Sequence, residues 1–129
     1  MVTVSRFPFD PQRGSLITEL WLSQVVLQAL NDLEGNNNFL AKLERYSRAG
    51  FEHYESKFGA PIKHEWNQVY RISDGGLFRI IGFYHGIRKS EFITIDAFTK
   101  RGRKLSSKER VRIDKVVNIK KEQLWKKET

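Results

Sequence analysis

The chain of 129 residues contains no cysteine, only three prolines and a single methionine. Without cysteine it can form no disulfide, no zinc–thiolate site and no cysteine nucleophile. No apolar run approaches the roughly 20 residues that a membrane span needs. Residues Met1 to Asp10 also lack the charged segment and apolar run of a signal peptide. We therefore expect a soluble, cytoplasmic protein that has no membrane partner.

The composition is typical of a folded protein rather than of a disordered one. Hydrophobic residues make up 40% of the chain and aromatic residues 12%, more than disordered chains contain. A length of 129 residues fits one domain. We predict a single domain over residues 1–129, with an N-terminal arm over 1–14 and a basic C-terminal tail over 122–129.

The charge is distributed very unevenly along the chain. From Met1 to Phe98 the sequence has 11 Lys/Arg and 11 Asp/Glu residues, so this part has no net charge. From Thr99 to Thr129 it has 12 Lys/Arg and 4 Asp/Glu residues, and the whole net charge of +8 lies there. A block of this kind indicates a polyanionic partner, most often a nucleic acid, although a solvated basic tail has the same composition.

Hydrophobic periodicity predicts two helices, three strands and a final helix. The predicted helices run from Ser15 to about Glu34, on to about Ala49, and from Ser106 onward; the predicted strands are Val69 to Ser73, Leu77 to Tyr84 and Ser90 to Phe98. Ser106 and Glu109 match a capping box at the start of the last helix. The predicted fold class is α+β: an N-terminal helical hairpin, an antiparallel sheet of three to four strands, and a C-terminal helix packed on that sheet.

Two arginines interrupt the apolar strands, and their relationship depends on the turn between them. With a three-residue turn, Arg71 lies directly opposite Arg79, and two like charges so placed repel unless an anion such as phosphate lies between them. With a two-residue turn, Arg71 faces Phe78 instead and the two arginines lie on opposite faces of the sheet. Two solvated arginines are the plain alternative in either case.

The third strand leads into a basic loop that contains four cations, Lys100, Arg101, Arg103 and Lys104, and one glycine. Such a loop can bind phosphate, but ordinary solvated turns are also often basic. The three histidines do not have the spacing of a metal site, and no glycine-rich phosphate loop is present. We therefore expect neither a metal nor a cofactor.

The middle of the chain resembles a known toxin family. The resemblance lies in Tyr70-Arg71-Ile72, Phe78-Arg79-Ile80-Ile81, Phe83-Tyr84-His85-Gly86 and Phe98-Thr99-Lys100-Arg101, followed by a helix. This order is similar to that of the RelE/ParE toxin superfamily, and closest to its phage-derived HigB-like branch. The resemblance covers about residues 67 to 120.

The resemblance implies a toxin of a toxin–antitoxin system that cuts messenger RNA on the ribosome without a metal. The 2′-hydroxyl of the RNA attacks the adjacent phosphate, which gives a 2′,3′-cyclic phosphate and a 5′-hydroxyl end. By position, Arg71 and Arg79 would stabilise the phosphate, and Lys100 and Arg101 would assist, including in proton transfer. The implied partners are a cognate antitoxin, the ribosome and mRNA.

Other residues are assigned more loosely. Many family members carry a late histidine or tyrosine as acid or base; this chain has none there, so Tyr84 and His85 are the substitutes. The further candidate RNA contacts are Arg88, Lys89, Arg103, Lys104 and Lys108. Two alternative functions stay open: a ParE-like poison of DNA gyrase, because fold does not determine target, and a non-catalytic module that binds nucleic acid.

Overall fold

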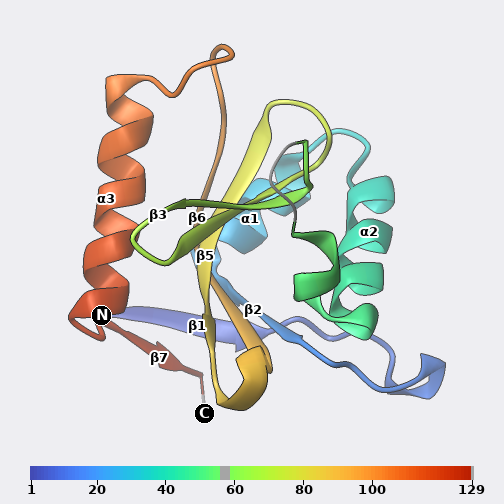
Figure 1. Cartoon of the computed structure of the whole chain (residues 1–129). Helices are drawn as coiled ribbons and strands as arrows, with labels where there is room; N and C mark the ends of the chain where they lie inside the picture. The colour runs from blue at the N-terminus through green and yellow to red at the C-terminus, as the bar shows by residue number, and fades with distance from the viewer. Residues whose placement is uncertain (56–58, 129) are drawn as a thin grey trace.

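The computed structural model describes residues 1–55 and 59–128, which form an α+β fold (Figure 1). The strands are β1 (Val2–Arg6), β2 (Glu19–Ser23), β3 (Ile62–Trp66), β4 (Val69–Ser73), β5 (Phe78–His85), β6 (Glu91–Thr99) and β7 (Trp125–Lys127). The α-helices are α1 (Gln24–Asp32), α2 (Asn36–Ala49) and α3 (Ser107–Lys121). Short 3-10 helices cover Pro11–Arg13, Phe51–Tyr54 and Ile87–Lys89. No helix among these residues is long and apolar enough to cross a membrane.

All seven strands belong to one mixed sheet in the order β3-β4-β5-β6-β2-β1-β7. The consecutive strands β3 to β6 are antiparallel, as predicted for the last three of them. The sheet then continues beyond the prediction, because β2 pairs parallel to β6 and β7 pairs parallel to β1. The prediction of a purely antiparallel sheet of three to four strands is therefore wrong, since it omitted both ends of the chain.

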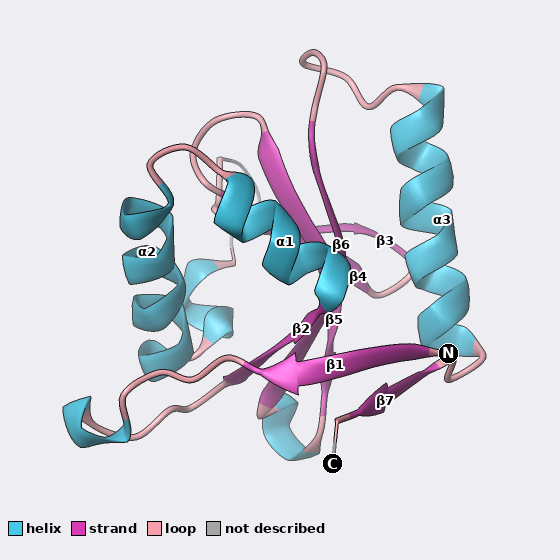
Figure 2. Cartoon of the chain, turned by 180° about the vertical axis from the view of Figure 1, so that it is seen from behind, coloured by secondary structure: helices cyan, strands magenta, loops and turns pink. Residues whose placement is uncertain are grey.

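Helices cover the two faces of the sheet, with α1 and α2 on one face and α3 on the other (Figures 1 and 2). Successive side chains of a strand point to opposite faces, so neighbours in β5 enter different cores. Ile80 packs in the core beneath α1 and α2. Ile81 packs in the core beneath α3, with Ile113 and Val116 of that helix.

The predicted N-terminal helical hairpin is wrong, because the chain begins with two strands. The first helix begins at Gln24 rather than after Ser15, and Ser23 caps it by accepting a hydrogen bond of 3.2 Å from the Val26 amide. In β2, Leu20 and Leu22 are buried while Trp21 between them is less so, which is the two-residue period of a strand. Leu22 fits both this period and the helical stripe that follows, so the local pattern alone extended the helix too far.

The segments predicted as an N-terminal arm and a basic tail also join the sheet. Val2 pairs with Trp125 and Val4 with Lys127, so β1 and β7 lie side by side. Trp125 lies edge-on against Phe83 and His85, with ring centroids 5.8 and 4.8 Å apart. The end of the chain is thus packed against the middle of it.

The last helix begins as its capping box predicts. The Ser106 hydroxyl accepts a hydrogen bond from the Glu109 amide, and the Glu109 carboxylate accepts one of 2.8 Å from the Ser106 amide. The Arg101 amide donates a further bond of 3.2 Å to Glu109. One buried carboxylate therefore fastens the basic loop to α3.

Candidate functional site

The two arginines share one face of the sheet, in a register that neither predicted turn describes. Ser73 pairs with Arg79 and Arg71 pairs with Ile81, so residues 74–78 separate the first pair of partners. Because side chains two positions apart lie on the same face, Arg71 and Arg79 are diagonal neighbours. Both turn-based predictions are therefore wrong, and the arginines lie neither directly opposite nor on opposite faces.

Arg79 is held tightly by one of its nitrogens. Its Nη1 donates to the Ser73 hydroxyl at 2.8 Å, to the Gly76 carbonyl at 2.6 Å and to the Phe78 carbonyl at 3.0 Å. Its Nε is buried and has no hydrogen-bond partner among the described residues. Nε is therefore closed to an incoming ligand, but Nη2 makes no hydrogen bond among the described residues and is not buried, so this fixed guanidinium can still bind an oxyanion.

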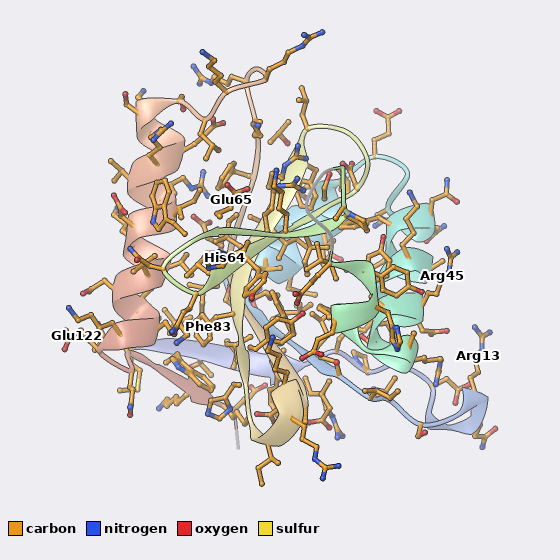
Figure 3. All side chains as sticks on the ribbon, viewed as in Figure 1. Arg13, Arg45, His64, Glu65, Phe83 and Glu122 are labelled. Carbon is orange, nitrogen blue, oxygen red and sulfur yellow. The ribbon has the colours of Figure 1, made fainter. Side chains whose placement is uncertain are left out.

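Burial lowers the pKa of the Arg79 guanidinium, and the positive charge of Arg71 lowers it further. Arg71 itself forms an ion pair with Glu65, whose Oε1 lies 3.0 Å from Arg71 Nε. Glu65 belongs to β3 and lies between α3 and the β4–β5 hairpin (Figure 3). The sequence pattern over residues 51 to 66 is ambiguous, so it did not predict this carboxylate at the site. The signal would have been the alternation of Lys63 and Glu65, had the pairing of β3 with β4 been known.

Lys100 joins the arginines from the end of β6. Its amide donates a bond of 2.8 Å to the Leu77 carbonyl, which ties it to the β4–β5 connection. Its Nζ donates a bond of 2.8 Å to the Arg103 carbonyl. Burial lowers the pKa of Lys100, and the positive charge of Arg79 adds to the effect. Three of the predicted catalytic cations, Arg71, Arg79 and Lys100, therefore act on one another electrostatically; we call them the cation cluster.

The other basic-loop residues lie beside this cluster, at the same end of the sheet (Figure 1). Arg101, Arg103 and Lys104 are exposed. Arg101 and Lys108 line a cleft of about 580 Å³ at the start of α3, together with Arg112. These cations extend the positive surface from the cation cluster towards α3.

Four predicted site residues lie at the other end of β5. Tyr84 is five positions from Arg79, or about 16 Å along a strand. Its hydroxyl donates a hydrogen bond to Glu55. Burial raises the pKa of Tyr84, and the bond to Glu55 raises it further. Its ring also lies 4.7 Å from Lys89 Nζ.

His85 has its own partners at that end. Its Nδ1 lies 2.7 Å from Glu91, which also binds Lys127. Arg88 and Lys89 belong to the turn between β5 and β6. The structure thus brings together Arg71, Arg79 and Lys100, with Arg101, Arg103, Lys104 and Lys108 nearby. It separates them from Tyr84, His85, Arg88 and Lys89.

Two further searches, for a metal-binding cluster in the described part of the chain and for similar proteins, found no match. Within residues 1–55 and 59–128, no three His, Asp or Glu side chains gather where they could hold a metal ion. No protein family, curated protein or solved structure matches the chain. The resemblance to RelE-like toxins therefore rests on the sequence motifs alone.

Proposed function

We propose that the chain is a ribosome-dependent mRNA endonuclease with a RelE-like fold. The observation that carries the proposal is the state of Arg79, which is half-buried, is fixed through Nη1 and leaves Nη2 without a hydrogen bond among the described residues. After burial, which is the largest cause in each case, Arg71 lowers the pKa of Arg79, and both arginines lower the pKa of Lys100. A phosphate that bears negative charge would relieve the repulsion among these three cations and could accept a hydrogen bond from Arg79 Nη2.

The proposed reaction transfers the phosphate from the 5′-oxygen of the next nucleotide to the 2′-oxygen of the preceding one. The bond from O2′ to phosphorus forms as the bond from phosphorus to O5′ breaks. Arg79 and Arg71 stabilise the negative charge that develops on the phosphate oxygens. The 2′-hydroxyl proton passes to a base and the leaving O5′ takes a proton from an acid. The products are a 2′,3′-cyclic phosphate and a 5′-hydroxyl end.

We assign the proton transfers to Glu65 and Lys100. Glu65 is the carboxylate that pairs with Arg71, and as an anion it can accept the 2′-hydroxyl proton. Lys100 has a lowered pKa, so its ammonium gives up a proton to the leaving oxygen more readily than an ordinary lysine does. Arg101 lies next to Lys100 and assists through its charge.

The fold and the charge support the wider proposal. Within residues 67 to 120, which carry the resemblance, the order β4, β5, β6 and α3 is the one that the resemblance implies, whereas β1, β2 and β7 lie outside it. The proposed substrate places the protein in the cytoplasm, on the ribosome. The proposed regulator is a cognate antitoxin that covers the cation cluster.

The test is mRNA cleavage in a reconstituted translation reaction, with and without ribosomes. The wild type is compared with Arg79→Ala and with Arg13→Ala, a control that removes an exposed arginine far from the cluster (Figure 3). We expect cuts only with ribosomes, and only from the wild type and Arg13→Ala. A folded wild type that makes no cuts under either condition contradicts the proposal.

One observation favours a second candidate, a module that binds RNA without cutting it. Tyr84 and His85 lie far from the cation cluster, so proton transfer depends on Glu65 and Lys100 alone. The second candidate predicts salt-sensitive RNA binding with no cyclic-phosphate product. If cells that express the protein keep intact mRNA but show DNA damage, the target is DNA gyrase instead, as in the ParE-like alternative.

A further inference from the structure

A cleft opens from the two arginines towards α2, on the side away from Lys100. Its volume is about 410 Å³, and Lys42, Gly75 and Gly76 line it together with Arg71 and Arg79. Lys42 is absent from the site that the sequence predicts. It brings a third cation to this cleft from an element that is distant in the sequence.

Lys42 has little to hold it where it is. Its Nζ lies 3.5 Å from the Asp74 carbonyl, a long hydrogen bond. Among residues 1–55 and 59–128, no carboxylate pairs with it. On the same helix, by contrast, Arg48 forms an ion pair with Glu44 at 3.5 Å. Lys42 therefore differs from Arg48 in having no carboxylate of its own helix, which the structure describes throughout, as a partner.

The turn beside Lys42 is closed by its own hydrogen bonds. The Gly75 amide donates to the Ser73 hydroxyl at 3.1 Å and the Gly76 amide donates to Asp74 Oδ1 at 2.8 Å. The turn therefore does not require Lys42 for its shape. Gly75 has a φ of +94°, which favours glycine, and a Cβ atom there would lie at an ordinary contact distance of 3.9 Å from Lys42 Nζ.

We propose that this cleft is a second phosphate subsite, in which Lys42 binds the phosphate next to the one held by Arg71 and Arg79. The inference rests on the proposed function in taking RNA as the ligand. The RNA strand then crosses the end of the sheet from the basic loop, over the two arginines, to α2. Lys42 acts in binding and takes no part in the chemistry.

The test is the salt dependence of binding to a 2′-O-methyl RNA oligonucleotide, which cannot be cut because it has no free 2′-hydroxyl. For a single strand, removing one cation that neutralises a phosphate reduces the slope of log K against log salt by about 0.7. We expect that reduction for Lys42→Ala and recovery of the wild-type slope in Lys42→Arg. Arg45→Ala is the matched control, because Arg45 is an exposed cation on the outer side of the same helix (Figure 3).

The outcomes separate the inference from the proposed function. A wild-type slope in folded Lys42→Ala, together with weakened binding in Arg79→Ala, overturns the second subsite and leaves the nuclease proposal standing. An equal reduction of the slope in Arg45→Ala also overturns it, because the effect would then come from the general charge of α2. Failure of the wild type to bind the oligonucleotide overturns the second subsite alone, because the nuclease proposal is decided separately by cleavage on ribosomes.

Discussion

Arg79 and Ser73 face each other across the β4–β5 hairpin, and Arg79 Nη1 lies 2.8 Å from the Ser73 hydroxyl. The same hydroxyl accepts the Gly75 amide at 3.1 Å. One small side chain therefore connects the guanidinium to the turn that also supplies its Gly76 carbonyl acceptor. The direction in which Arg79 points depends on the conformation of this turn.

Ser73→Ala should lower kcat about tenfold while KM changes little, because a guanidinium without the Ser73 hydroxyl as acceptor spends less time in the productive geometry. The measurement is steady-state cleavage on programmed ribosomes, with Arg79→Ala as the inactive reference. Ser73→Thr, which keeps the hydroxyl, should recover most of the rate. A rise in KM at constant kcat would show that Ser73 acts in binding instead.

Tyr84→Phe and His85→Gln should leave cleavage close to the wild-type rate, because both side chains lie at the other end of β5 and have other partners. Tyr84→Phe should lower the free energy of unfolding by about 1 kcal/mol, since the Glu55 carboxylate loses a hydrogen bond. Cleavage rates and urea unfolding of the two variants provide the check. Loss of activity in a stable variant would mean that the tyrosine or histidine takes part in catalysis.

Protonation of Glu109 should lower the free energy of unfolding in acid. Burial by itself raises the pKa of this carboxyl, but hydrogen bonds from Ser106 and from the Arg101 amide outweigh burial, so the pKa is lowered in the folded protein. A lowered pKa contributes stability above the unfolded value of about 4.3, and this contribution is lost as the pH falls through the folded value.

The check for Glu109 is urea unfolding of the wild type and Glu109→Gln at pH 7, 5 and 3. The wild type should be the more stable at pH 7 and 5, and the difference should shrink at pH 3. Glu122→Gln is the control, because Glu122 is an exposed carboxylate at the other end of α3 (Figure 3). A difference that stays constant across the three pH values would argue against a role for the ionised Glu109.

Gly82→Ala should destabilise the protein by about 3 kcal/mol or prevent folding, because the added methyl group would overlap the backbone of the neighbouring strand β6. A Cβ atom at this position would lie 2.2 Å from the Ile93 carbonyl oxygen and 2.9 Å from the Thr94 Cα. The register of β5 and β6 shifts at this point, which brings the two backbones together. Thermal unfolding measures the effect, and Gly102→Ala, in an open loop position, should be nearly neutral.

The sequence predicted those parts of the fold whose signals are local. The β4 to β6 strands follow from short apolar runs separated by turns, and the start of α3 follows from the Ser106 capping box. The pairing of β2 with β6 and of β1 with β7 joins segments that are far apart in the chain. No local pattern encodes such pairings, so the sequence did not predict them.

The same distinction holds for the candidate site. Arg71, Arg79 and Lys100 could be predicted because each lies in or at the end of a recognisable strand. Their register could not, because residues 74–78, which separate Ser73 from its partner Arg79, are more than either turn that the glycines suggested would leave between partners. Glu65 and Lys42 reach the site from β3 and α2 through tertiary contacts, which the sequence does not show.

The pairing of β1 with β7 has a consequence for the order in which the protein folds. Val2 of β1 pairs with Trp125 of β7, and these two strands are further apart in the sequence than any other pair in the sheet. Their pairing therefore has the largest cost in loop-closure entropy. It also cannot form until residue 127 has been synthesised, whereas the β4–β5 hairpin can form much earlier. The strands that carry the arginines can therefore fold during translation before β1 and β7 are able to pair.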